Sequence, residues 1–107
     1  MANAKLVNKK NSGLKIGVIG VGGWGKNHVR VLYNMGVLGA VCDLSQERAK
    51  EIAEKYNTKS YTSMSDFFSN ERELDACLVC TPTKSHLSVV KEVIGNGCHA
   101  FVEKPLS

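Results

Sequence analysis

The chain lacks the features that mark a membrane, secreted or multidomain protein. With 107 residues it can bury one hydrophobic core, so a complete two-domain enzyme is excluded. It has no long hydrophobic run, because the apolar stretch at residues 16–21 is interrupted by glycine and soon followed by Lys26, His28 and Arg30. That pattern fits neither a signal peptide nor a membrane span. With only two prolines and no internal repeat, the composition is that of one ordinary globular domain with no membrane partner.

The part of the chain that we expect to fold, residues 14–107, also has no strong excess of positive charge. The net charge is +4, from 14 basic and 10 acidic residues. Lys5, Lys9 and Lys10 precede Gly13 in a segment without acids, so 14 minus 3 leaves 11 basic residues against 10 acidic ones. Surfaces that bind nucleic acids cluster Lys and Arg, whereas here these residues alternate with Glu and Asp. We therefore expect no nucleic-acid partner.

The motifs of several enzyme classes do not occur. The sequence has no Walker-type Gly-Lys-Ser, no Gly-x-Ser-x-Gly nucleophile elbow and no Asp-rich metal loop. Phosphoryl transfer and serine hydrolysis lose support, and we expect no metal site.

The four cysteines, Cys42, Cys77, Cys80 and Cys98, lie mostly inside apolar runs, unlike those of a small disulfide scaffold. Cys77 and Cys80 form a C-x-x-C pattern. Residues three apart on a strand point to opposite faces of the sheet, so these two thiols can share neither a metal nor a disulfide there. We interpret the cysteines as core residues and predict a cytoplasmic location.

Short apolar runs alternate with amphipathic stretches along the chain. The runs predict strands at residues 14–19, 37–42, 76–80 and 99–102, with a brief edge strand at 59–62. Apolar residues at helical spacing predict helices from the glycines to Gly36, at 49–56, at 65–69 and at 87–94. In the last of these we expect Leu87, Val90 and Ile94 to face the core. The alternation predicts an α/β fold: a doubly wound parallel (Rossmann) sheet of about five strands in the order 3-2-1-4-5, with helices on both faces.

The segment from Gly20 to Gly25, Gly-Val-Gly-Gly-Trp-Gly, matches the pattern G-x-G-x-x-G. It follows a predicted strand and opens a predicted helix in a unit of the right length, which are the conditions for a dinucleotide site. Gly20 allows the tight turn, Gly22 lets a pyrophosphate approach the backbone, and Gly25 lets the helix pack close to the strand. Free N–H groups near Trp24 and Gly25 would face the anion. We predict that Gly20, Gly22, Gly23, Trp24 and Gly25 bind the cofactor; the alternative is a turn that serves only to reverse the chain.

Asp43 ends the second predicted strand, 23 positions after Gly20 (43 minus 20). A carboxylate at this point can accept hydrogen bonds from the adenosine ribose and would repel a 2′-phosphate, which predicts NAD rather than NADP. Ser45 and Arg48 could nevertheless accommodate a phosphate. Asp43 with Gln46 could also form a capping box for the following helix, and one residue could do both. A flavin or S-adenosylmethionine site remains an alternative, although nothing beyond the glycine turn calls for it.

Four motifs are similar, in order and spacing, to those of a known family. They are Gly20-x-Gly22-x-x-Gly25-x-x-His28, Cys42-Asp43, Thr81-Pro82-Thr83-x-x-His86 and Glu103-Lys104-Pro105. Over residues 15–107 the chain resembles the glucose-fructose oxidoreductase and inositol dehydrogenase (Gfo/Idh/MocA) superfamily, and the Glu-Lys-Pro motif is the most specific of the set. Residues 24–28 and 81–86 are most similar to members that oxidise the 3-hydroxyl of UDP-N-acetylated sugars or sugar acids.

The resemblance implies further site residues. Thr81, Pro82 and His86 would bind the cofactor beside the nicotinamide ribose, and Glu103 and Lys104 would border the nicotinamide and the substrate. Lys104 is the implied catalytic residue, which would polarise or deprotonate the substrate hydroxyl. All five follow predicted parallel strands at their carboxyl ends, where open sheets bind ligands.

Structural roles are the alternatives for several of these residues. Thr81 and Ser85 could cap the helix that follows them. His86 could be a solvated residue of the first helical turn, and Lys104 a surface charge before a turn.

The chain differs from the family in its length. Members continue after Glu-Lys-Pro into a substrate domain with an antiparallel sheet and an Asp-x-x-x-His-like pair, and neither residue of that pair can be assigned here. We expect a basic, flexible segment at residues 1–13 and an NAD(P)-binding Rossmann domain at residues 14–107. The chain would then be a truncated reading frame, a fragment or a stand-alone nucleotide module.

Two functions from different classes follow. The leading hypothesis is the cofactor-binding part of a nicotinamide-dependent dehydrogenase that acts on a sugar or nucleotide-sugar hydroxyl in the longer protein. The alternative is a non-catalytic module that binds a dinucleotide or another protein. In either case we expect the chain alone to have no catalytic activity. The sequence leaves open whether the protein forms a homo-oligomer.

Overall fold

The computed structural model describes residues 13–102. The predicted basic segment, apart from Gly13, lies outside the described residues, and so do Glu103, Lys104 and Pro105. Their predicted roles therefore stay predictions.

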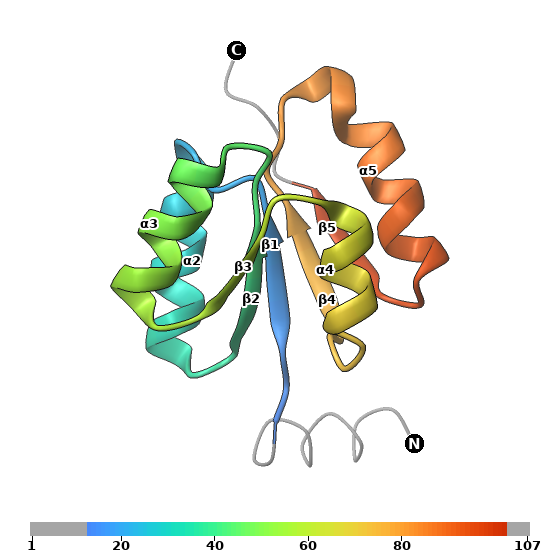
Figure 1. Ribbon diagram of the computed structural model, residues 1–107. Coiled ribbons are helices and arrows are strands. Elements are labelled where there is room, and N and C mark those ends of the chain that lie inside the picture. The colour runs from blue at the N-terminus through green and yellow to red at the C-terminus, as the bar shows by residue number, and fades with distance from the viewer. Residues whose placement is uncertain (1–12, 103–107) are drawn as a thin grey trace.

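The strands form one parallel sheet, with β1 in the middle (Figure 1). The five strands are β1 (Ile16–Ile19), β2 (Leu38–Cys42), β3 (Lys59–Tyr61), β4 (Ala76–Val79) and β5 (His99–Val102). Their order is β3-β2-β1-β4-β5 and every neighbouring pair is parallel, which confirms the predicted topology. Because β1 lies between β2 and β4, the order reverses at β1, and the glycine turn leaves the sheet at that point.

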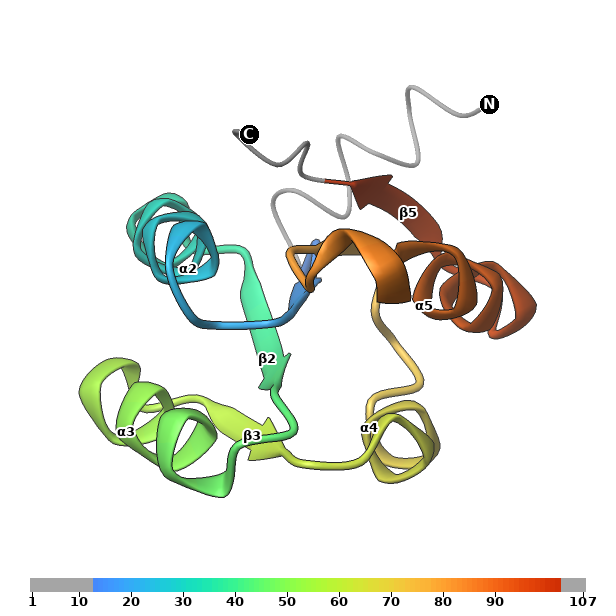
Figure 2. The same cartoon turned by 90° about the horizontal axis from the view of Figure 1, so that it is seen from above.

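Helices cover both faces of the sheet, as Figure 2 shows from above. They are α2 (Trp24–Met35), α3 (Gln46–Tyr56), α4 (Met64–Asn70) and α5 (Thr83–Gly95). The pair α2 and α3 packs on one face, and the pair α4 and α5 on the other. Helix α2 ends where predicted, at Gly36, whose φ of 77° is the left-handed conformation typical of a helix C-terminus. No helix within residues 13–102 combines the length and the apolarity that a membrane crossing requires.

Each face of the sheet has its own hydrophobic cluster. The cluster under α2 and α3 contains Val18, Val21, Val29, Leu32, Val37, Val41 and Ile52. The cluster under α4 and α5 is built around the fully buried Phe67, which packs edge-on against Tyr61 and Phe68. One layer of helices packs on each face of the sheet, and together the two layers hold the carboxyl ends of β1, β2 and β4 in place. Those ends form the site described below.

The C-x-x-C cysteines point into different clusters, as predicted. Cys77 is fully buried under α4 and α5, whereas Cys80 packs against the cluster of the opposite face. Burial, together with the neighbouring Cys98, raises the pKa of Cys77 to about 12. This thiol stays protonated at neutral pH, which fits a packing role.

The prediction of which residues of α5 face the core is wrong. Leu87 and Ile94 are 68% and 60% exposed, and Val89 and Val93 are the buried residues. Val90 alone of the predicted stripe packs partly against the core. The sequence of α5 carries two overlapping apolar stripes, and the direction in which the chain leaves β4 turns the stripe with Val89 and Val93 toward the sheet.

Candidate functional site

A cavity of about 880 Å³ lies where the carboxyl ends of β1, β2 and β4 meet. Three connections form its walls: the glycine turn between β1 and α2, the loop between β2 and α3, and the loop between β4 and α5. Its lining includes most of the predicted cofactor-binding residues, namely Gly20, Gly22, Gly23, Trp24, Asp43, Thr81 and Pro82. In open parallel sheets this is the position, outside the strand ends where the order reverses, at which ligands bind.

The glycine turn is tied to the sheet by its own backbone. The N–H of Gly20 donates to the carbonyl of Cys42 across 2.8 Å, and the N–H of Gly25 donates to the carbonyl of Gly22 across 2.9 Å. The prediction that the Gly25 N–H is free is therefore wrong, because the turn closes on itself. Helix α2 begins at Trp24 with no side-chain cap and no acidic residue in its first turn. Its positive end thus faces the cavity with no acidic side chain in its own first turn to offset it.

Two glycines of the turn differ in what their missing side chains permit. A Cβ on Gly25 would lie 1.9 Å from the carbonyl oxygen of Gly20, so the fold itself requires glycine there. The three atoms nearest to a Cβ on Gly22 all belong to the Arg48 guanidinium, and the nearest is a nitrogen at 3.1 Å. A flexible side chain end can move aside. Gly22 is therefore dispensable for packing and lies open to a ligand.

Asp43 is only 9% exposed, and both of its carboxylate oxygens are held by backbone. Oδ2 accepts from the N–H of Val21 at 2.9 Å, and Oδ1 accepts from the N–H of Ser45 at 2.8 Å. Each oxygen has a second lone pair that a ligand hydroxyl can use. The predicted capping box is wrong, because Ser45, not Asp43, caps α3 by accepting from the N–H of Arg48.

The loop between β4 and α5 forms the opposite wall. Pro82 is the N-cap of α5 and no side chain caps this helix, so the predicted capping by Thr81 or Ser85 is wrong. The Ser85 hydroxyl instead donates to the carbonyl of Pro82 across 3.0 Å. Oγ1 of Thr81 is buried and has no hydrogen-bond partner among the described residues. Buried hydroxyls normally have partners, so this one retains unused hydrogen-bonding capacity.

His86 does not line the cavity. Its Nε2 donates to the carbonyl of Thr81 from the first turn of α5, and the side chain is half-buried. Its direct contact with the cofactor stays a prediction, as do the roles of Glu103 and Lys104, which lie outside the described residues.

Other lining residues were not singled out from the sequence. Leu44 follows Asp43 directly, and position alone could have indicated it. Met64 comes from the start of α4, and no local signal connects it to the glycine turn. Cys42, which the sequence indicated only as a core thiol and as part of the Cys42-Asp43 motif, also lines the cavity. Burial, together with the adjacent Asp43 carboxylate, raises its pKa to about 11. This thiol is protonated at neutral pH and is no nucleophile.

These features fit a dinucleotide. The positive end of α2 and the open backbone at Gly22 suit a pyrophosphate, and the anchored carboxylate of Asp43 suits ribose hydroxyls. Within residues 13–102, no three His, Cys, Asp or Glu side chains gather closely enough to hold a metal ion.

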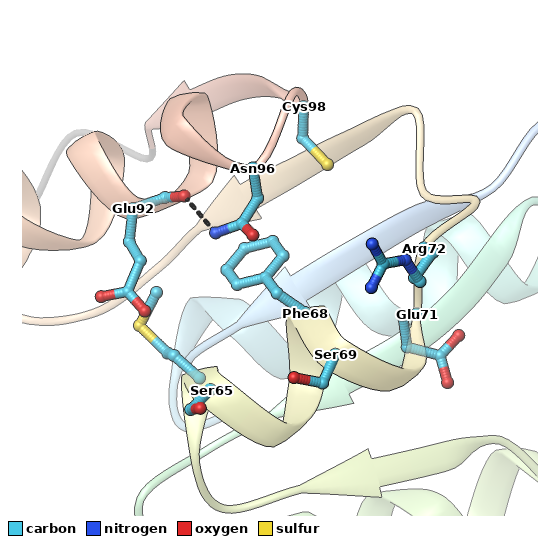
Figure 3. A pocket seen from close by; sticks show the side chains of 9 residues that line it. Ser65, Phe68, Ser69, Glu71, Arg72, Glu92, Asn96 and Cys98 are labelled. Atoms are coloured by element: carbon cyan, nitrogen blue, oxygen red, sulfur yellow. Dashed lines mark hydrogen bonds between the residues drawn. The ribbon is translucent and has the colours of Figure 1, made fainter.

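A second cavity, of about 390 Å³, lies between α4 and α5 (Figure 3). Side chains from the two helices face each other across it, among them Ser65 and Phe68 of α4 and Glu92 of α5. None of the predicted site residues lines it. The larger cavity is therefore the candidate site.

Comparison with known proteins agrees with this geometry. The model of an oxidoreductase family with an NAD-binding Rossmann fold matches residues 14–107. UDP-N-acetylglucosamine 3-dehydrogenase of Acidithiobacillus ferrooxidans is 32% identical over 94 residues, and myo-inositol 2-dehydrogenase of Thermotoga maritima is 34% identical over 97 residues. Each match covers 88% of this chain but 29% of the relative, so the chain spans under a third of their length.

A solved structure extends the comparison to a bound cofactor. The WlbA dehydrogenase from Bordetella pertussis, in complex with NADH and UDP-GlcNAcA, superposes with a TM-score of 0.80 at 26% identity. The superposition covers 89% of this chain and 30% of the other. The strand order, the glycine turn and the match over residues 14–107 lead to one conclusion: the chain belongs to the Gfo/Idh/MocA oxidoreductase family and carries its NAD-binding Rossmann fold.

Proposed function

We propose that the larger cavity binds NAD in preference to NADP. We also propose that the chain is the cofactor-binding part of a dehydrogenase acting on a hydroxyl of a sugar or nucleotide sugar. The observation that carries the first proposal is Gly22, which faces the cavity beside the uncapped N-terminus of α2 and which protein packing does not require. A glycine of this kind is explained by a ligand that approaches the backbone closely.

The residues of this chain would divide the dinucleotide between them. Gly22, Gly23 and Trp24 would hold the pyrophosphate at the start of α2, where backbone N–H groups and the helix dipole favour an anion. Asp43 would accept hydrogen bonds from the adenosine ribose with its remaining lone pairs. Thr81 and Pro82 would form the opposite wall.

The preference for NAD is a question of charge. Asp43 is held by two backbone N–H groups, so its carboxylate cannot turn away from an approaching 2′-phosphate. Arg48 lines the same cavity and opposes this effect, because a guanidinium suits a phosphate. We expect the carboxylate, which is held in place, to outweigh the flexible Arg48 side chain, so that NADP binds more weakly than NAD.

The substrate proposal rests on the relatives. The relatives include a UDP-N-acetylglucosamine 3-dehydrogenase and two inositol 2-dehydrogenases, whose names give a nucleotide sugar or inositol as the substrate. The bound nicotinamide would supply the hydride acceptor. In the longer protein, Lys104 would polarise or deprotonate the substrate hydroxyl, together with residues of the substrate domain.

The cofactor site is tested by a pair of glycine substitutions. NAD is titrated into the chain and the binding followed by calorimetry, or by the fluorescence of Trp24, the single tryptophan, which lines the cavity. Gly22→Val should abolish binding, because its side chain would fill the space of the pyrophosphate, whereas its Cβ has only the movable end of Arg48 as its nearest neighbour. Gly95→Val is the matched control, since a Cβ at Gly95 meets nothing within 4 Å, and it should bind like the native chain.

A circular dichroism spectrum shows whether each variant is folded. Undiminished NAD binding by a folded Gly22→Val variant would rule out this cavity as the cofactor site.

A further inference from the structure

The loop from Cys80 to Pro82 joins β4 to α5 and forms one wall of the larger cavity. The carbonyls of its last two residues are both occupied by side chains of α5. Pro82 accepts from the N–H and the hydroxyl of Ser85, at 2.9 and 3.0 Å. Thr81 accepts from Nε2 of His86 at 2.5 Å. The first turn of α5 thus holds the loop by its carbonyl groups.

This arrangement decides which groups the loop presents to the cavity. With the carbonyls of Thr81 and Pro82 turned toward α5, they are not available to a ligand. Helix α5 has no side-chain cap, so its first N–H groups keep the capacity to bind an acceptor. The wall is thereby suited to an anion or a hydroxyl oxygen.

His86 contacts this loop from the side that faces away from the cavity. It contacts Thr81 but is absent from the cavity lining, whereas Thr81, Pro82, Thr83 and Ser85 all line it. A carbonyl only accepts hydrogen bonds, so Nε2 carries the proton, in the neutral ring and in the cation alike. The two partners are five positions apart, so the contact bridges the helix start and is not a regular helical hydrogen bond.

Thr81 has unused hydrogen-bonding capacity. Its Oγ1 is buried without a partner among residues 13–102, although its carbonyl is firmly held. Fixing the backbone of Thr81 also fixes the direction of its hydroxyl relative to the cavity. A loop free to rotate would lose that direction and would expose a carbonyl to the ligand.

We propose that His86 is a positioning residue of the dinucleotide site: its bond to the Thr81 carbonyl holds the Thr81 hydroxyl and the start of α5 in the orientation that binds the cofactor. The proposal rests on the proposed function, because it takes NAD as the ligand of the cavity. His86 itself does not touch the cofactor.

Three variants of His86 test this role. His86→Leu removes the donor and should weaken NAD binding about three- to tenfold, as expected for the loss of one hydrogen bond. His86→Gln places an amide nitrogen three bonds beyond Cβ, as far as Nε2, and should restore most of the affinity. His86→Asn is its matched control, since its shorter amide reaches only the position of Nδ1 and should bind NAD as weakly as the Leu variant.

A double substitution tests whether His86 acts through Thr81. Thr81→Val removes the hydroxyl at nearly constant shape and should weaken NAD binding in the native background. In the His86→Leu background, the same change should have little further effect, because the hydroxyl is already misplaced. Denaturant unfolding of each variant separates this coupling from a loss of stability.

Each outcome bears on one proposal. Native affinity in His86→Leu, equal weakening by Leu and Gln, or full additivity with Thr81→Val would overturn the role of His86. These results are compatible with a functioning site, provided that Gly22→Val abolishes binding. If the native chain does not bind NAD at all, the proposed function fails, and the role of His86 fails with it.

Discussion

Asp43 at the end of β2 holds Val21 in the glycine turn: its Oδ2 accepts from the Val21 N–H across 2.9 Å. Val21 is fully buried, so its N–H has no access to water and depends on this carboxylate. The residue expected to recognise the ribose is thus also a structural brace of the turn that would hold the pyrophosphate. This double role determines how substitutions of Asp43 must be interpreted.

Asp43→Asn separates the charge of this residue from its bracing role. The amide keeps one oxygen, which can accept from the buried Val21 N–H, but it loses the acceptor for the half-buried Ser45 N–H and the negative charge. We therefore expect NAD to lose affinity and the gap in affinity between NAD and NADP to narrow. Charge-assisted hydrogen bonds contribute about 1.5–3 kcal/mol, so the loss for NAD should be about tenfold or more. Titration of both cofactors measures the gap. Glu47→Gln is the control: it removes an exposed acid in the first turn of α3 outside the cavity lining and should leave the ratio unchanged.

Asp43→Ala should behave differently, because it leaves the buried Val21 N–H without an acceptor. An unsatisfied buried group costs about 1–3 kcal/mol, which should appear as a lower free energy of unfolding and weaker binding of both cofactors. If the native chain binds NAD and NADP equally, Asp43 has only the bracing role.

Gly25→Ala should destabilise the fold whether or not cofactor is present. The added Cβ would lie 1.9 Å from the carbonyl oxygen of Gly20, so α2 would have to move away from β1. Overpacking of this severity costs about 3 kcal/mol or more, measured by urea unfolding. Gly95→Ala, where a Cβ meets nothing within 4 Å, should show no loss. Native stability in Gly25→Ala would mean that the close contact of helix and strand is not required.

Stability should fall in alkaline solution because of the buried thiols. Burial raises the pKa of Cys77 from 9.0 to about 12, and the pKa values of Cys42 and Cys98 shift in the same direction. Above about pH 9 the unfolded chain loses thiol protons that the folded chain keeps, so the free energy of unfolding decreases as pH rises. Below about pH 8 it should show no dependence on these thiols.

Unfolding in urea with a reducing agent, at several values between about pH 7 and 10.5, measures this slope. Cys77→Ala is less stable because of its cavity, but its decline with pH should be shallower. An equal decline in the variant and the native chain would show that Cys77 does not contribute to it.

Turnover should require more than this chain. Hydride transfer needs the substrate carbon held near the nicotinamide and a base within reach of its hydroxyl. We therefore expect the 107-residue chain to reduce no NAD with sugar substrates, as judged by absorbance at about 340 nm. Steady NADH production by the chain, lost in Lys104→Met, would show that no second domain is needed.

In a longer protein that carries a substrate domain, Lys104→Met should lower turnover by about 10²- to 10⁴-fold, with much less effect on NAD affinity. Unaltered turnover there would leave Lys104 a surface charge.

The sequence by itself determined the topology and the place of the site. Strand and helix periods, the glycine turn and the helix stop at Gly36 are local signals that depend on residues a few positions apart. They were enough to predict the order β3-β2-β1-β4-β5 and the cavity at the strand ends. The family resemblance added Thr81 and Pro82, which local patterns alone do not connect to the glycine turn.

Only the tertiary structure decided which partners these residues have. The hydrogen bond between Asp43 and Val21 joins residues 22 positions apart. Ser45, and not Asp43, is the N-cap of α3. The burial of Val89 and Val93 instead of Leu87 and Ile94 depends on how α5 lies on the sheet, and both stripes satisfy the helical period equally well. The contact of His86 with Thr81 depends on the path of the loop before α5. Such contacts are set by the meeting of separate elements in space, which no local pattern of residues specifies.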